Sequence, residues 1–255
     1  MNTDKQISKS PNLQINHCLH LADTALILGQ RNSEWCAHGP ILEQDIAITN
    51  ITLDLIGQAR NFYQYAAALI NNAENKNETE DSLAYLRNER DFKNFLICEL
   101  PNDNWAQTIL RQFLFSVYQE LLFEKLIACN DEQLAAIAAK SIKETKYHVK
   151  WSSEWVIRLG DGTDESKAKM EKAIDELWMY TGEFFIPNDF DIIDVTSLKS
   201  NWLEKIKEIF EEATLSVPEN TFMQSGGKNG IHTEHLGFLL SEMQVLQKTY
   251  PGAHW

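Results

Sequence analysis

The stretch SIKETKYHVKW, residues 141–151, decides the fold. It lies in a longer run where apolar or small residues recur every three or four positions, a spacing that places them on one face of a helix. The face comprises Leu134, Ile137, Ala138, Ser141, Ile142, Thr145, His148, Ser152, Trp155 and Leu159. Because such a face is buried against other elements, we predict that Thr145 and His148 point into a core.

The frame Thr145-x-x-His148 has the spacing of a metal-binding pair. Side chains three residues apart on a helix can reach one metal ion, and four-helix di-iron proteins use Glu-x-x-His pairs in this way. A threonine hydroxyl stays protonated at neutral pH and brings no charge, so it is a poor iron ligand. Glu144 also shares a face with His148 and could pair with it. A buried histidine hydrogen-bonded to a neighbouring carboxylate is therefore the alternative to a metal ligand.

An earlier long helix should supply the other half of such a site. Its inward pair is Leu55-x-x-Gln58, in which leucine cannot bind a metal and neutral glutamine is a weak donor to iron. Asp54 lies one residue off the inward stripe, about 100° around the helix. Together with Thr145, two positions that ought to hold carboxylates hold none, which favours a mixed polar core over a metal site.

Composition limits the class of protein. The chain has 255 residues, 44% of them hydrophobic and 24% charged, and a formal net charge of −14. These values are ordinary for a soluble globular protein, and the negative charge argues against nucleic acid or an anionic membrane as a partner. There is no signal-peptide pattern and no run long enough to span a membrane. Scattered Cys18, Cys36, Cys98 and Cys129 predict reduced thiols in a cytoplasmic protein.

Helical patterns follow one another along the chain and strand patterns are nearly absent. The predicted helices are 13–30, 40–70, 81–100, 104–129, 131–160, 165–185, 198–215 and 232–250. Pro40 is predicted at a first helical position, Asp103 and Asp131 as helix caps, and Pro101 as a helix stop. The fold class is all-α, a long-helix bundle with additional C-terminal helices. We expect a flexible N-terminus over 1–12 and a single helical domain over 13–255.

Three further patterns allow more than one interpretation. Gly226–Gly230 (GGKNG) precedes a helix and could cradle an anion, although it lacks the P-loop spacing and a Gly-rich linker is commoner. His232-x-x-His235 with Glu234 could bind zinc, but the sequence places no third ligand, which favours surface or partner-facing histidines. Trp151, Trp155, Trp178 and Tyr180 most simply pack in a core or an interface.

Long segments resemble one family, the C subunits of bacterial ring-1,2-phenylacetyl-CoA epoxidases. The resemblance covers residues 15–255 and is carried by RNSEWCAHGPILEQDIAITNITLDLIGQARNFYQYAAAL, RNERDFKNFL, IKETKYHVKWSSEWVIRLGDGTDES and GGKNGIHTEHLG. It implies a ferritin-like helical fold and a structural, non-catalytic role beside a related catalytic subunit. The catalytic relative carries Glu-x-x-His pairs where this chain has Leu55-x-x-Gln58 and Thr145-x-x-His148. The resemblance and the missing ligands together imply that Leu55, Gln58, Thr145 and His148 are the positions of a vestigial metal site, with no metal bound and no catalytic residue.

The resemblance also implies partners and cofactors. Two such chains would join two catalytic A subunits, with a small B subunit in contact, and the complex would epoxidise the ring of phenylacetyl-CoA with O₂. No cofactor is expected in this chain. The di-iron centre would belong to the catalytic partner, and NADPH, flavin and iron–sulfur groups would belong to a reductase partner.

Two short stretches are implied to border the partner's CoA cleft. They are Asp91-Phe92-Lys93-Asn94 and Ile192-Ile193-Asp194, where the second stretch lies in a region of variable loop length. Lys93 could meet a CoA phosphate as a point charge. A solvated helix face is the alternative for the first stretch.

Two rival functions remain. One is an autonomous di-iron or zinc oxidoreductase that uses Asp54, Glu144, His148 and the His232/His235 pair. The other is a helical adaptor with no part in oxygen chemistry. The missing ligands count against the first rival, and the resemblance along the whole chain counts against the second.

Overall fold

The computed structural model describes residues 11–219 and 221–253, which form helices and no strand. The elements are α1 (Pro11–Ser33), α2 (Leu42–Glu74), α3 (Glu80–Tyr85), η1 (Glu89–Asp91), α4 (Leu96–Glu99), α5 (Trp105–Leu126), α6 (Glu132–Gly160), α7 (Asp164–Leu177), η2 (Trp178–Phe185), η3 (Val195–Leu198), α8 (Lys199–Glu212), η4 (Gly227–Asn229), α9 (Glu234–Met243) and α10 (Val245–Thr249), where η marks 3₁₀ helices. The predicted all-α, ferritin-like class is confirmed.

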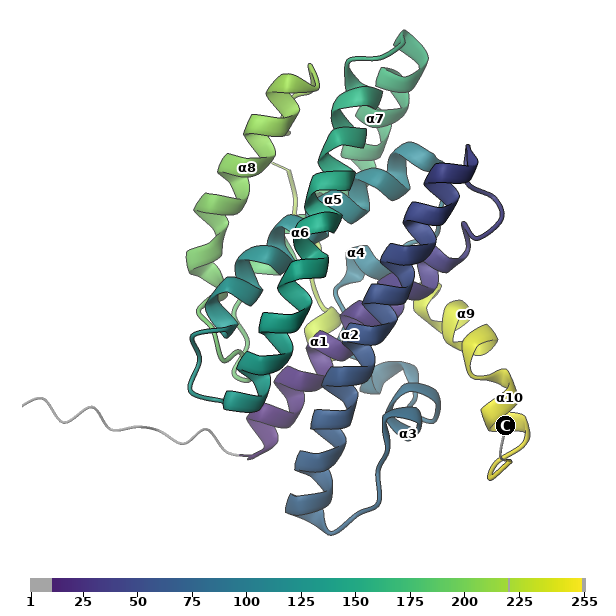
Figure 1. Ribbon diagram of the computed structural model, residues 1–255, viewed down its shortest axis with the longest axis vertical. Coiled ribbons are helices and arrows are strands. Elements are labelled where there is room, and N and C mark those ends of the chain that lie inside the picture. Colours follow the sequence, from purple (N-terminus) through teal and green to yellow (C-terminus); the bar gives the residue numbers. More distant parts are fainter. Residues whose placement is uncertain (1–10, 220, 254–255) are drawn as a thin grey trace, which may run out of the picture.

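Four long helices make the bundle. Helix α1 packs along α2, and α5 packs along α6, each pair antiparallel (Figure 1). Contact between α2 and α6 joins the two pairs. Helices α7 and α8 cover the α5–α6 pair, while α9 and α10 extend away from the bundle at the C-terminal end (Figure 1). No helix in the described ranges is both long enough and apolar enough to cross a membrane.

The helix that carries the opening stretch has the predicted ends. Asp131 is its N-cap, and the Asp131 side chain accepts a hydrogen bond from the Leu134 backbone N–H at 3.0 Å. The helix ends at Gly160, where an added Cβ would lie 2.4 Å from the Ala213 carbonyl oxygen. A glycine is therefore required where the α6 terminus meets the chain that leaves α8.

Two predicted helix starts and the N-terminal boundary need correction. Helix α2 begins at Leu42 with Ile41 as N-cap, so Pro40 lies outside it. Asn104, not Asp103, caps α5 by accepting from the Gln107 N–H. Residues 1–10 of the predicted flexible segment 1–12 lie outside the described residues. Its last two residues, beginning with Pro11, already belong to α1, because proline is well accommodated at a first helical position.

The predicted helix over 81–100 is wrong. Helix α3 ends at Tyr85, η1 follows, and residues 92–95 are extended or irregular before the short α4. The predicted helix 165–185 is shorter than expected, because 178–185 form a 3₁₀ helix. The predicted helix 198–215 is shorter as well, since α8 runs from Lys199 to Glu212, and the last predicted helix divides at Gln244. The irregular segment 92–95 is nevertheless largely buried, and its partners are described below.

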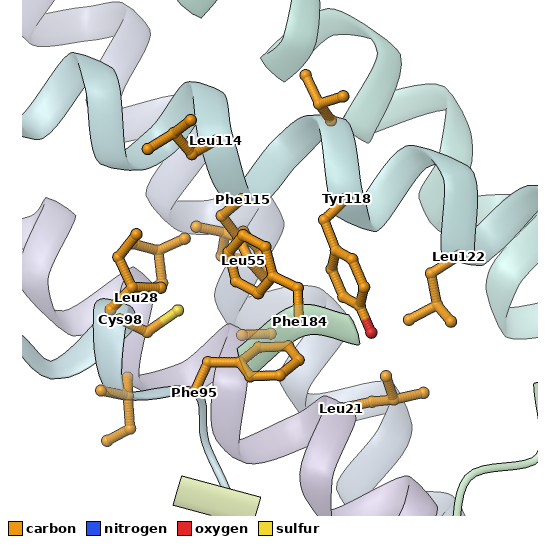
Figure 2. Close-up of a cluster of buried hydrophobic side chains, with 14 of the residues drawn as sticks. Leu21, Leu28, Leu55, Phe95, Cys98, Leu114, Phe115, Tyr118, Leu122 and Phe184 are labelled. Carbon is orange, nitrogen blue, oxygen red and sulfur yellow. The ribbon is translucent and has the colours of Figure 1, made fainter. Parts of the chain in front are cut away.

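Aromatic packing fixes that irregular segment to the bundle. The ring of Tyr118 in α5 stacks on Phe184 of η2 with centroids 4.8 Å apart, and Phe95 meets Phe184 edge-on at 5.0 Å (Figure 2). Such pairs add about 0.5–1.5 kcal/mol each to the burial of the rings. The predicted tryptophan cluster divides in two: Trp151 and Trp155 flank Trp105, whereas Trp178 packs on Trp202.

Candidate functional site

A chain of neutral polar groups occupies the centre of the bundle. Thr145 Oγ1 donates to Gln119 Oε1 (3.2 Å), and Gln119 Nε2 donates to Gln58 Oε1 (3.1 Å). Gln58 Nε2 then donates to Glu144 Oε2 at 3.0 Å. Gln58, Gln119 and Thr145 are buried, and they come from α2, α5 and α6. The chain of hydrogen bonds therefore joins three bundle helices.

His148 bonds across the bundle, not along its own helix. Its Nε2 lies 3.0 Å from Asp54 Oδ2 of α2, and the His148 side chain is fully buried while that of Asp54 is one-third exposed. Its Nδ1 has no hydrogen-bond partner within residues 11–219 and 221–253. The partner is thus Asp54, the residue one position off the inward stripe, because the carboxylate reaches the α2–α6 contact from its edge. Glu144 pairs with Gln58 instead.

These residues do not fit a di-iron centre. Leu55 is fully buried and offers no donor atom, and the oxygens of Gln58, Gln119 and Thr145 are engaged with one another. A di-iron centre needs several carboxylates to neutralise and bridge its ions. Within residues 11–219 and 221–253, no group of three or more His, Cys, Asp or Glu side chains could hold a metal ion. The interior is built for hydrogen bonding between helices.

The stretch Asp91–Asn94 divides into exposed and buried halves. Asp91 is exposed and Lys93 half-exposed, whereas Phe92 and Asn94 are fully buried. The Phe92 ring lies under the Arg87 guanidinium, with the Arg87 Cζ 4.3 Å from the ring centroid. Asn94 Nδ2 donates to Glu99 Oε2 at 2.9 Å. Only Asp91 and Lys93 are therefore placed to meet a ligand. We call residues 91–96 the edge segment.

A surface groove of about 510 Å³ runs beside the edge segment. Its lining includes Lys93, Arg90, Arg87 and Lys76, although carboxylates of α2 and the following loop also contribute. Lys76 is paired with Glu74 at 2.6 Å. Arg90 and Lys93 therefore share the groove with the carboxylates of Glu74, Glu78 and Asp91, so its lining carries both signs of charge.

Phe190, two residues before the stretch Ile192–Asp194, lies near the edge segment, with Lys93 Nζ 5.8 Å from the centroid of its ring. Ile192 and Ile193 pack against the core, and Asp194 is exposed. Asp194 caps η3, and its hydrogen bonds from Thr196 lower the pKa of its carboxyl group.

Comparison with known proteins shows the family of this chain. All 255 residues match the family model described as "Phenylacetic acid catabolic protein". The chain belongs to that family. It is 46% identical over 247 residues to a protein of Escherichia coli (strain K12) named as the C subunit of 1,2-phenylacetyl-CoA epoxidase, a match that covers 94% of this chain and 98% of that protein.

In this family member, the Gly226–Gly230 loop does hold an anion, but the anion is internal. The backbone N–H groups of Gly226 and Gly227 donate to Glu183 Oε1 at 2.8 and 2.7 Å. Burial raises the pKa of Glu183, and hydrogen bonds from Leu96, Gly226 and Gly227 work against that rise. The loop side chain Lys228 is buried and pairs with Asp191 at 2.8 Å. The loop therefore presents no free phosphate cradle.

His232 is also engaged. Its Nδ1 lies 2.9 Å from Glu99 Oε2, and its Nε2 lies 2.9 Å from the Phe92 carbonyl oxygen. Both ring nitrogens are used, so the pairing with His235 considered for zinc is not formed. The loop 226–233 instead rests against the edge segment, and we call it the seating loop.

Sequence reasoning missed Gln119, Asp23 and Glu99. Gln119 is a buried amide within the aromatic run of α5, and a polar residue in such a run is the signal that could have found it. Asp23 and Glu99 are buried carboxylates in apolar surroundings, and their partners lie far away in the sequence. Periodicity identifies such residues as inward-facing but does not identify their partners.

Proposed function

We propose that this chain is a non-catalytic subunit of a phenylacetyl-CoA epoxidase that supports the catalytic subunit and borders its CoA cleft. The observation that carries the proposal is the interior of the bundle, where Leu55, Gln58 and Thr145 stand at positions of the vestigial metal site and the two polar side chains are hydrogen-bonded through Gln119. The likeness to a protein named as the C subunit of such an enzyme supplies the reaction.

The proposed partners follow from the same likeness. Two copies of this chain join two catalytic A subunits, with a small B subunit in contact. The di-iron centre belongs to the A subunit, and the NADPH, flavin and iron–sulfur groups belong to a separate reductase. This chain binds no cofactor.

An apolar stripe on α2 supports a contact between subunits. Leu42, Ile46 and Leu53 lie on one face of the helix and are 72%, 51% and 61% exposed. Large apolar side chains gathered on one exposed helix face are typical of protein–protein interfaces. We propose that this face contacts another member of the complex.

The iron content of separated chains tests the proposal. We expect this chain, purified alone, to hold no stoichiometric iron and to leave phenylacetyl-CoA unoxidised with any reductant, because its inward positions lack anionic ligands. Metal analysis and Mössbauer spectroscopy on each chain after co-purification measure this. The catalytic subunit, taken through the same steps, is the control. Two irons in each copy of this chain would refute the non-catalytic role.

The proposal that Lys93 meets CoA at the cleft has its own test. Lys93→Glu should raise the KM of the assembled complex for phenylacetyl-CoA several-fold, more at low salt, with kcat little changed. The effect is modest because a partly exposed charge pair contributes about 0–1 kcal/mol.

The matched control is Lys207→Glu, which makes the same charge change at an exposed lysine of α8 outside the groove. Co-purification with the catalytic subunit verifies that each variant still assembles. An intact Lys93→Glu complex whose KM equals that of the control at low salt would place Lys93 on an ordinary solvated surface.

A further inference from the structure

The edge segment has no regular hydrogen-bonding pattern of its own, and distant side chains hold its backbone. The Lys93 N–H donates to Asp23 Oδ2 (2.8 Å), and the Leu96 N–H donates to Glu183 Oε2 (2.8 Å). Two histidines lie on consecutive carbonyls: His20 Nδ1 is 2.7 Å from the Lys93 oxygen, and His232 Nε2 is 2.9 Å from the Phe92 oxygen. A carbonyl oxygen only accepts, so each of these ring nitrogens carries a proton.

The two histidines differ in charge. Burial lowers the pKa of His20 well below its ordinary value, and Nε2 of His20 has no partner, so this ring is neutral. His232 has an acceptor at each nitrogen. Its second partner, Glu99, already accepts from the Thr233 N–H (2.6 Å) and from Asn94 Nδ2 (2.9 Å). These donors occupy both Glu99 oxygens, so the hydrogen bond between Glu99 and His232 uses a proton on Nδ1, and His232 donates from both nitrogens as an imidazolium.

The surroundings of His232 favour that charge. Burial alone lowers the pKa of His232, but the hydrogen bond and charge of Glu99, the Phe92 carbonyl and the charge of Glu89 together raise it. The charged and titratable groups that pack around this cluster are Glu89 of η1, Glu99 and Cys98 of α4, Tyr180 and Glu183 of η2, Arg31 of α1, and His235 of α9. Arg31 donates to the Glu99 backbone carbonyl at 2.8 Å, so a second cation lies close to the backbone of Glu99.

We propose that His232 is a positioning residue: as a cation between Glu99 and the Phe92 carbonyl it holds the edge segment in place, and the segment loosens when His232 loses its proton. That this loosening affects the binding of phenylacetyl-CoA rests on the proposed function. The pKa of folded His232 is raised, so its stabilising contribution is complete below about 6.5, the ordinary histidine value, and is lost as pH rises through the folded pKa.

Hydrogen exchange in the full-length chain tests the positioning role. We compare wild type with His232→Gln, which removes the charge and one donor, at a series of pH values below and above the ordinary histidine pKa. At the acid end, amides of residues 92–98 should exchange about tenfold faster in the variant, because a charge-assisted hydrogen bond is lost. The ratio of the two rates should approach one as pH rises, and taking ratios at equal pH cancels the intrinsic dependence of exchange on pH.

His235→Gln is the matched control, with the same substitution three residues away on a half-exposed ring. A rate ratio of one at every pH would show that His232 does not hold the segment, and a raised ratio that is independent of pH would show that its proton is not involved. If the variant does not fold, ¹⁵N spectra of the wild-type ring decide. A ring that carries protons on both nitrogens at neutral pH, and that loses one of them as pH rises while the Phe92 and Lys93 amides shift, supports the proposal. A ring that is neutral at neutral pH refutes it.

Kinetics of the assembled complex separate this inference from the proposed function. If exchange behaves as expected, the KM of wild type for phenylacetyl-CoA should rise with pH toward that of His232→Gln. If exchange behaves as expected but the KM does not change, the proposal that the edge segment borders the CoA cleft is refuted, and the positioning role of His232 stands.

Discussion

Arg87→Met is expected to lower the free energy of unfolding of the full-length chain by about 3–5 kcal/mol, because it leaves a buried carboxylate without its counter-ion. The Asp23 side chain is fully buried, and both terminal nitrogens of Arg87 donate to its oxygens. Tyr63 Oη also donates to Asp23, and Arg87 donates to the Asp91 carbonyl at 3.0 Å. Burial works against the Arg87 charge, yet Asp23 raises the Arg87 pKa above its ordinary value.

Urea unfolding of wild type and variant measures this effect, and Arg60→Met is the matched control. Arg60 forms an exposed pair with Glu80, and such surface pairs contribute about 0–1 kcal/mol. In the double variant with Asp23→Asn, the buried charge is also gone, so part of the lost stability should return. Equal losses for Arg87→Met and Arg60→Met would contradict the view that Asp23 depends on Arg87.

The sequence could predict those parts of the fold that local signals determine. Helices 131–160 and 40–70 were predictable because their apolar periodicity, the Asp131 cap and the terminal Gly160 are local signals. The same signals predict that Leu55, Gln58, Thr145 and His148 face inward, and all four are fully or almost fully buried. Local periodicity determines which side of a helix is buried.

The segment 86–100 was mispredicted because its conformation depends on distant partners. Its backbone and Arg87 bond to Asp23, His20, Glu183 and His232, which lie 64 to 140 positions away in the sequence. Extended backbone can be buried only where its polar groups find such partners, and no local pattern indicates them. The role of the seating loop was hidden for the same reason, since GGKNG has the composition of a linker or an anion cradle and binds a carboxylate of its own chain.

The interior of the bundle shows a similar limit. The sequence indicated that carboxylates were missing, because Leu55 and Thr145 stand where acidic ligands would be needed. It did not indicate what replaces them, since Thr145 and Gln58 are joined through Gln119 on a third helix. Each buried hydrogen bond of this kind contributes about 1 kcal/mol net, but a broken one leaves a buried polar group unpaired and costs more. The network therefore acts as a unit that fixes how α2, α5 and α6 pack.

Gly227→Ala should destabilise the chain and displace the edge segment, because the seating loop leaves no space for a side chain. A Cβ at Gly227 would lie 2.0 Å from the Asn94 carbonyl oxygen, a backbone atom that cannot turn aside, and 3.3 Å from Glu183 Oε1. Relief of that overlap moves either the loop or residues 92–95, and overpacking of this kind costs about 1–3 kcal/mol or more. Urea unfolding measures the loss, and hydrogen exchange of residues 92–98 locates it.

Gly57→Ala is the control, with the opposite expected sign. Gly57 lies in α2, and a Cβ added there would have nothing within 4 Å, so alanine should stabilise the helix by about 0.5–1 kcal/mol. The two identical substitutions thus separate a steric effect at the seating loop from a general effect of replacing glycine. Suppose that Gly227→Ala is as stable as wild type and that exchange at the edge segment does not change. The seating loop then does not pack against Asn94, and the claim that residues 226–233 support the edge segment is wrong.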